Sequence, residues 1–462
     1  MRILLTALAA ALLTACATTP PLPPAILSAY VVLGEGGAPA ARVLTDAAAC
    51  PAIAIDGRTQ AMHVRAAPAT IAQRPTASAP EDSKPSAFPV LTCEAALPAG
   101  TQAAAVAGVP LPVPRAEARR IVVIGDSGCR LKKADHAWQP CNDPEQTPFG
   151  TIAATAAAWQ PDLVVHVGDY HYRENACPDG NAGCAGSPWG YGWDTWREDF
   201  FRPAEPLLRA APWVVVRGNH ETCVRAGQGW WRFLDPRPLQ RGRDCNAAAD
   251  DATGDYSDPY AVPLGGDAQL LVLDTAATSW RGLKAGDTGY ARYRDTYTQA
   301  DTLSQRATWN LLANHHPILG YGAGFDKAGQ SYLELGDKGL QQSFGSLNPL
   351  LLPPRVQALL SGHVHLWEQV SFRTDHPSQF IAGFSGTLED VVPLPADPTS
   401  VQPAPGAVIH QFSVWQGGFG FMTMERAAAD TWHVGVYDRH GVLRNRCRLQ
   451  GRQSSCAVAS VQ

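Results

Sequence analysis

The sequence lacks several features that would place it in other classes of protein. Its 462 residues include eleven cysteines but no CxxC pair, which argues against a cysteine-rich metal site. Lys and Arg total 37 against 42 Asp and Glu, so the net charge of −5 offers no basic footprint for nucleic acid. Beyond the N-terminus, no apolar run approaches the ~20 residues that cross a bilayer. The remaining class is a globular chain, long enough for one large domain and a smaller one.

The N-terminus has the pattern of an export signal. Met1 and Arg2 precede a short, largely apolar stretch from Ile3 to Leu13, which is too short to span a membrane as a helix. The next residues, Leu13-Thr14-Ala15-Cys16, resemble the lipobox of bacterial lipoproteins. That resemblance implies that Cys16 is acylated, and Ala17 after it favours the outer membrane over the inner one. The alternative is an ordinary cleaved signal in which Cys16 is incidental.

We therefore expect an exported protein of the bacterial cell envelope, attached by its lipid alone and facing the periplasm or the surface. Without Cys16, ten cysteines remain, enough for five disulfides in an oxidising compartment. Proximity in the sequence suggests the pairs, although spacing alone does not fix connectivity. They are Cys50–Cys93, Cys129–Cys141, Cys177–Cys184, Cys223–Cys245 and Cys447–Cys456.

Composition along the chain predicts its division into segments. Residues 17–26 are rich in Ala, Thr and Pro and indicate a tether. Short apolar stretches broken by Pro, Gly and Ser predict a small all-β N-terminal domain over 27–115. The full division is a signal with its lipobox cysteine at 1–16, the tether at 17–26, the β-rich domain at 27–115, a catalytic domain at 116–450 and a C-terminal tail at 451–462.

Three buried apolar runs in the first half of the catalytic domain each lead into a polar residue. The runs at 121–124, 163–167 and 212–216 are followed by Asp126, Asp169 and Asn219. Helix-like segments at 149–159 and 193–210 separate the runs, which indicates βαβ units. Ligand sites of such folds gather at the carboxyl ends of the strands, so these three side chains are expected at one edge.

The second half repeats this pattern with histidines. The run at 309–313 leads to His315 and His316, and the run at 356–360 leads to His363 and His365. Carboxylate, amide and imidazole ligands together suit transition metals rather than calcium. The alternating stretches between 411 and 449 are expected to complete a second β-sheet.

Five motifs in fixed order carry a family resemblance. Gly125-Asp126-Ser127-Gly128, Gly168-Asp169-Tyr170-His171-Tyr172, Gly218-Asn219-His220-Glu221, His315-His316-Pro317 and Gly362-His363-Val364-His365 resemble the metallophosphoesterase (calcineurin-like) superfamily. The match is most similar to purple acid phosphatases, because Gly128 stands where many relatives have histidine and Tyr172 follows Asp169 by three residues. The resemblance implies an α/β fold, a two-sheet sandwich flanked by helices.

The resemblance also implies two metal ions and their ligands. The first, typically Fe(III), would be held by Asp126, Asp169, Tyr172 and His365. The second, typically Zn, Mn or Fe(II), would be held by Asp169, Asn219, His315 and His363, with Asp169 bridging. His316 is an alternative ligand, although the family's H-x-P pattern favours His315.

His220 is expected to stay off the metals and face the substrate. It would protonate the departing alkoxide or stabilise phosphoryl charge, or alternatively only orient Asn219. The expected activity is an acid phosphomonoesterase that uses metal-bound hydroxide as nucleophile on a small phosphate ester. The alternatives are a phosphodiesterase of the same superfamily and a non-catalytic envelope metal-binding protein. The complete ligand set argues against the latter.

Overall fold

The computed structural model of the chain describes residues 22–23, 25–326 and 330–458. Cys16 and the rest of the predicted export signal lie outside these residues. Within the described ranges, no helix combines the length and hydrophobicity needed to span a membrane.

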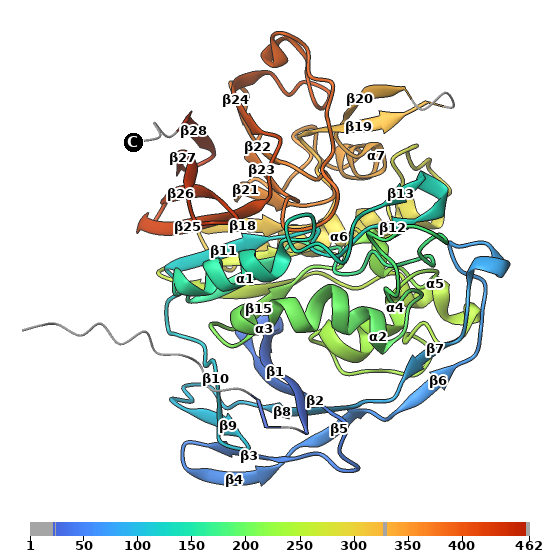
Figure 1. The fold of residues 1–462 in the computed structure, drawn as a ribbon. Coiled ribbons are helices and arrows are strands. Elements are labelled where there is room, and N and C mark those ends of the chain that lie inside the picture. The colour runs from blue at the N-terminus through green and yellow to red at the C-terminus, as the bar shows by residue number, and fades with distance from the viewer. Residues whose placement is uncertain (1–21, 24, 327–329, 459–462) are drawn as a thin grey trace, which may run out of the picture.

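Two large mixed β-sheets form the framework of the molecule (Figure 1). The first has eleven strands, in the order β28 (Gln453–Val458), β27 (Leu443–Gln450), β26 (Thr431–Asp438), β25 (Gly420–Ala428), β11 (Arg120–Ile124), β14 (Leu163–His166), β15 (Trp213–Val215), β1 (Ile26–Leu33), β2 (Pro39–Thr45), β8 (Leu91–Ala96) and β5 (His63–Ala66). The second has seven, in the order β16 (Tyr260–Gly265), β17 (Ala268–Val272), β18 (Trp309–Ala313), β21 (Val356–Ser361), β23 (Ser378–Ala382), β22 (Trp367–Phe372) and β24 (Ile409–Trp415).

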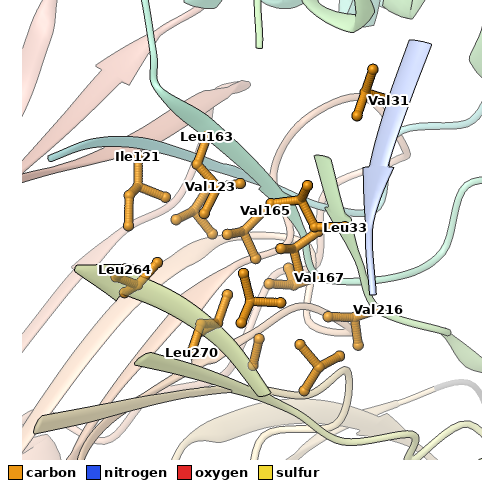
Figure 2. Packing of buried hydrophobic residues seen from close by; sticks show 14 of the residues in the cluster. Val31, Leu33, Ile121, Val123, Leu163, Val165, Val167, Val216, Leu264 and Leu270 are labelled. Carbon is orange, nitrogen blue, oxygen red and sulfur yellow. The ribbon is translucent and has the colours of Figure 1, made fainter. Parts of the chain in front are cut away.

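The largest apolar core lies between these two sheets. Side chains of β11 and β14, such as Val123 and Val165, pack with Leu270 of the second sheet (Figure 2). Alternate residues of the same strands, such as Val122 and Val164, point to the opposite face and join a second core. Because both faces are buried, these strands are continuous apolar runs rather than alternating ones.

Helices cover the outer face of each sheet. The first sheet packs against α1 (Phe149–Ala158), α2 (Trp193–Trp196) and α3 (Arg202–Leu208). The second packs against α6 (Thr288–Ser304) and α7 (Lys338–Gly345). Two short helices, α4 (Gly227–Gly229) and α5 (Asp251–Gly254), lie in loops. The predicted two-sheet α/β sandwich flanked by helices is confirmed.

The N-terminal region is β-rich, as predicted, and it is also joined to the first sheet. β1 pairs in parallel with β15 at Val32 and Trp213, and β2, β8 and β5 continue the sheet outward. The remaining strands form two small sheets, β10 (Val109–Leu111), β9 (Ala104–Val106), β3 (Ala52–Ile55) and β4 (Arg58–Ala61), and β6 (Ala69–Ile71) with β7 (Ser86–Phe88). The domain boundary at residue 115 stays a prediction.

The C-terminal stretches, predicted to complete a second sheet, divide between the two sheets. β24 lies in the second sheet, but β25 pairs antiparallel with β11, and β26, β27 and β28 follow it in the first sheet. The pairing gives β11 a partner on the side away from β14, where its backbone groups would otherwise be an open edge.

All five predicted disulfide pairs are present. Cys447–Cys456 joins the neighbouring strands β27 and β28, Cys50–Cys93 joins the segment before β3 to β8, and the other three join loop segments. Those three are Cys129–Cys141, Cys177–Cys184 and Cys223–Cys245. Five disulfides are typical of a protein exported to an oxidising compartment.

Candidate metal centre

The candidate site lies where loops from the two sheets meet. β11, β14 and β15 are parallel neighbours, so the loops carrying Asp126, Asp169 and Asn219 leave the same edge of the first sheet. β18 and β21 are parallel neighbours in the second sheet and lead to His315 and His363. The structure therefore brings the seven ligand candidates and His220 into one buried cluster.

Three of the candidate ligands have a backbone conformation that residues other than glycine rarely adopt. Asp126, Asp169 and His363 have φ values of 56°, 58° and 71°. Such left-handed residues cost energy and persist where the surrounding structure holds them, often at functional sites. Each lies two or three residues after a strand end, in the turn that directs its side chain toward the cluster.

Tyr172 is the centre of the first group of candidate ligands. Its Oη shares one proton between two acceptors, Asp126 Oδ1 at 2.8 Å and Asp169 Oδ2 at 3.0 Å, and lies 3.1 Å from His365 Nε2. The side chain is fully buried, and burial raises the pKa of the phenol well above its usual value. Four groups on three separate loops thus share one small volume.

Asn219 is the centre of the second group. Its Oδ1 lies 3.0 Å from His315 Nε2 and 3.0 Å from His363 Nδ1. Asp169 Oδ2 is 3.2 Å from His315 Nε2, while the same oxygen accepts from Tyr172. The Asp169 carboxylate is therefore shared by both groups, which is the position that a bridging ligand requires.

The hydrogen bonds made by His315 and His365 indicate that a cation fits between the candidate ligands. His315 Nδ1 donates to Val167 O at 2.8 Å, and His365 Nδ1 donates to Leu388 O at 2.7 Å. In the neutral form of each ring, Nε2 then carries only a lone pair. The lone pair of His315 is directed at two oxygen acceptors, Asn219 Oδ1 and Asp169 Oδ2, and His365 Nε2 lies 3.5 Å from Asp126 Oδ1.

Such a convergence of acceptors requires a proton or a metal ion. Burial disfavours a charged imidazole, yet the neighbouring Asp169 carboxylate raises the pKa of His315 to about 9. Two groups of three potential ligand atoms lie within 4.8 Å of one another, Asp126 with Asp169 and His315, and His315 with His316 and His363. The donor atoms suit a transition metal, and Asp169 and His315 are fixed by further hydrogen bonds.

His220 lies beside the two groups and is held by a carboxylate that the sequence did not reveal. Its backbone N–H donates to Asp169 Oδ1 at 2.8 Å, and its ring centroid is 4.1 Å from that of Tyr172. Its Nδ1 is 2.7 Å from Glu174 Oε1, and Arg225 Nε is 3.6 Å from the same oxygen. Burial lowers the pKa of His220 to about 4.

His316 is also part of the cluster. Its ring centroid is 4.3 Å from that of His363, and its Nδ1 is 3.4 Å from Thr275 Oγ1. Burial lowers its pKa well below the usual value, so the ring is neutral and free to accept. The geometry therefore keeps His316 as a further candidate ligand, as the sequence left it.

Two more acidic residues hold the loops in place. Glu221 accepts backbone N–H groups of Asp169 at 3.1 Å, Tyr170 at 2.9 Å and Gly218 at 3.1 Å. Asp199, from the helical segment before α3, accepts from Tyr172 N at 2.7 Å. Glu221 is visible in the third motif, but nothing in the sequence links Asp199 or Glu174 to the site.

Asp199 also explains why the first motif has glycine at position 128. A Cβ atom at Gly128 would lie 2.8 Å from Asp199 Oδ2 and 3.0 Å from Tyr170 O. A histidine at this position, as in many relatives of the resembled superfamily, would collide with the group that anchors Tyr172. Gly128 and Tyr172 are thus structurally coupled through Asp199.

A cavity of about 340 Å³ opens beside the second group. His316 and His363 form one wall, and residues 332–338 with Trp280 form another. His220 is only 4% exposed and Asp126 is fully buried, whereas His363 is partly exposed. The accessible side of the cluster is therefore the side of His363 and this cavity.

Comparison with known families and structures agrees with this geometry. The family pattern described as "Calcineurin-like phosphoesterase" matches residues 119–366. A search of curated proteins found no match. The fold is similar to purple acid phosphatase PPD1 from yellow lupin (Lupinus luteus) seeds, with a TM-score of 0.55, 15% identity, and coverage of 94% of this chain and 74% of that one. It is also similar to PhoD, with a TM-score of 0.54, 13% identity and coverage of 94% and 92%.

Proposed function

The chain belongs to the calcineurin-like phosphoesterase family, and on that premise we propose that it is a phosphomonoesterase that uses two metal ions. The family consists of metal-dependent phosphoric ester hydrolases, and the described residues include candidate metal groups. The single observation that carries the proposal is the sharing of Asp169 Oδ2 between Tyr172 Oη at 3.0 Å and His315 Nε2 at 3.2 Å.

The proposed ligand assignment follows the two groups of contacts. Asp126, Asp169, Tyr172 and His365 hold the first metal, and we propose Fe(III) there because a phenolate is a hard, anionic donor. Asp169, Asn219, His315 and His363 hold the second, which we propose to be Zn, Mn or Fe(II). Carbonyl acceptors at Nδ1 of His315 and His365 fix the tautomer that each ring needs as a ligand.

A pair of bound cations supplies an activated water and neutralises charge on the phosphoryl oxygens. The protein residues then bind, orient and supply protons. His220 presents Nε2 on the side of Asp169, at 3.9 Å from its Oδ2, while Glu174 contacts its Nδ1. We propose that at acid pH, where the ring is protonated, this side chain donates a proton from Nε2 to the departing alkoxide, with Glu174 orienting the ring.

A panel of monoesters and diesters, assayed together with metal analysis, tests the proposal. We expect about two metal ions per chain and turnover of monoesters at least ~10-fold faster than of diesters. Asp169→Asn is expected to lose both metals, because it contributes to both groups. Preferential diester cleavage would instead make the chain a phosphodiesterase, and full metal content without turnover would make it a binding protein.

We further propose that the protein is attached to the cell envelope through a lipid on Cys16. The proposal is supported by the sequence Leu13-Thr14-Ala15-Cys16 and by the ten other cysteines, which form five disulfides and leave Cys16 as the odd one. Because Ala17 follows Cys16, we also propose that the protein is retained at the outer membrane.

A further inference from the structure

The cavity beside His316 and His363 has a second wall that is built from elements outside the five motifs. β19 (Tyr321–Phe325) and β20 (Ser331–Leu335) form a hairpin that stands beside α7 (Figure 1). The cavity lies between this hairpin, the start of α7 and the loop that carries Trp280. Its volume of about 340 Å³ is within the range of small-molecule pockets and far exceeds what a phosphate group needs.

Two aromatic side chains in its wall are exposed in the protein. Trp280 is 51% exposed and Tyr332 is 40% exposed, although both residues line the cavity. Large aromatic side chains bury 150–250 Å² when covered, so a partner is expected to bind against them. The Arg281 guanidinium lies 4.9 Å from the centroid of the Trp280 ring.

The aromatic walls are held in place by packing and hydrogen bonds. Across the hairpin, Tyr332 pairs with Gly324, where a Cβ would lie 2.3 Å from the tyrosine ring. The Tyr332 ring therefore packs directly against the backbone at Gly324. The Trp280 loop is tied to α7 by Thr278 Oγ1, which donates to Asp337 Oδ1 at 2.8 Å, and by Gly339 N, which donates to Ser279 O at 3.1 Å. A fixed pocket loses little entropy on binding.

The charges around the cavity offset each other. Lys338 and Glu334 both line it and attract one another, and Asp337 is committed to capping α7 through Leu340 N at 2.8 Å. The Arg281 guanidinium beside Trp280 is a second cation, so two carboxylates and two cations surround a group that binds against the aromatic faces. An uncharged, planar group fits these walls best.

We propose that this cavity is the leaving-group subsite and that Trp280 and Tyr332 select phosphate esters of planar aromatic alcohols. The inference rests on the proposed function, because it places the phosphate at the metal centre. The exposed side of the cluster is at His363, so an ester whose phosphate reaches that centre has its alcohol directed into the cavity. The two aromatic residues bind the substrate's leaving group in the ground state and the transition state alike, and so act on KM rather than kcat.

Binding of two non-hydrolysable phosphonates to the metal-containing protein tests the subsite separately from catalysis. Calorimetric titration should show that wild-type protein binds phenylphosphonate about tenfold more tightly than methylphosphonate, the scale of one aromatic stacking contact. Trp280→Ala and Tyr332→Ala should each lose most of this preference while binding inorganic phosphate as the wild type does.

Trp159→Ala is the matched control. Trp159 is a half-buried tryptophan at the end of α1 whose ring contacts the guanidinium of Arg120, the first residue of β11, whereas the site follows the last residue of that strand; Trp159→Ala should leave the preference intact. Absence of a preference in wild-type protein, or its survival in both cavity variants, would overturn the subsite. If the proposed function is wrong, the wild-type protein should fail to hydrolyse phenyl phosphate, whatever its preference between the two phosphonates.

Discussion

Tyr172 connects the chemistry of the first candidate metal to a visible property. Its Oη contacts both Asp126 and Asp169, so a metal held by these carboxylates would also bind the phenolate. If that metal is Fe(III), the purified protein should be coloured by charge transfer from tyrosinate to iron. Tyr172→Phe should bleach the colour, which visible absorption spectra with iron analysis will measure. An active, iron-containing but colourless wild-type protein would contradict the assignment of Tyr172 as an iron ligand.

We propose that His220 acts on the substrate without binding a metal. His220→Ala should retain both metals yet lose turnover, by ~10²–10⁴-fold if the ring is a general acid. The loss should be smaller for nitrophenyl phosphate than for an alkyl phosphate, because nitrophenolate departs without a proton. Turnover rates of the wild type and His220→Ala on both esters, together with metal analysis, will test this.

Two matched variants separate the roles around His220. Asn219→Ala should lower occupancy of the second metal and slow all esters alike. Glu174→Gln keeps the size of the side chain that contacts His220 Nδ1, so it should retain the metals and lose less activity than His220→Ala. Equal slowing of both esters in His220→Ala would leave only orientation or charge stabilisation.

Glu368, three residues after His365, is a buried acid whose effect on the free energy of unfolding depends on pH. Its Oε1 accepts from Tyr321 N at 3.0 Å, its Oε2 has no hydrogen-bond partner among the described residues, and burial raises its pKa to about 8. A raised folded-state pKa stabilises the fold at low pH, and this contribution is lost as pH rises from about 4.5 toward 8. The loss has an upper bound of about 5 kcal/mol for this pKa difference.

Glu368→Gln removes that titration. The free energy of unfolding, measured with urea, should decrease in the wild type as the pH rises from 5 to 8. In Glu368→Gln this decrease should be smaller by several kcal/mol. The exposed Glu425, replaced by Gln, is the control and should follow the wild type. Parallel pH dependence of all three proteins would show that Glu368 is ionised in the fold.

At the scale of elements, the site depends on how closely the strand-end loops approach one another. A Cβ at Gly218 would lie 2.1 Å from Asp169 Oδ1 and 2.3 Å from Asp169 N. Gly218→Ala should therefore displace the Asp169 loop, lowering metal content and thermal stability together. Metal analysis and melting curves will measure both.

Gly150→Ala in α1 provides the comparison, because the nearest atom to its Cβ is 3.8 Å away. Alanine in a helix should stabilise the protein by about 0.5–1 kcal/mol with unchanged metal content. If Gly218→Ala kept both metals, the loop would be more adaptable than its packing indicates.

At the scale of the whole molecule, the proposed anchor determines where the enzyme acts. Cys16→Ser should release the protein from membrane fractions or block its maturation, because no other cysteine among the described residues is free of a disulfide. Fractionation of cells that express each form measures this. A wild-type protein found wholly in the soluble fraction after export would contradict the lipid anchor.

The sequence by itself determined the features that depend on neighbouring residues. Apolar runs ending in polar residues predicted β11, β14, β15, β18 and β21 and the ligand candidates after them, because parallel strands present their carboxyl ends at one edge. Cysteine proximity predicted the five disulfides. The order of five short motifs was specific enough to indicate the family.

Only the tertiary structure decided what depends on contacts between distant residues. The attachment of β1 to β15, the pairing of β25 with β11, and the contacts of Asp199 and Glu174 join segments whose local patterns fit several partners. A strand's composition shows that it is buried but not which strand lies beside it. The cavity of Trp280 and Tyr332 is likewise formed by loops with no shared motif, so its walls became evident only from their packing around His363.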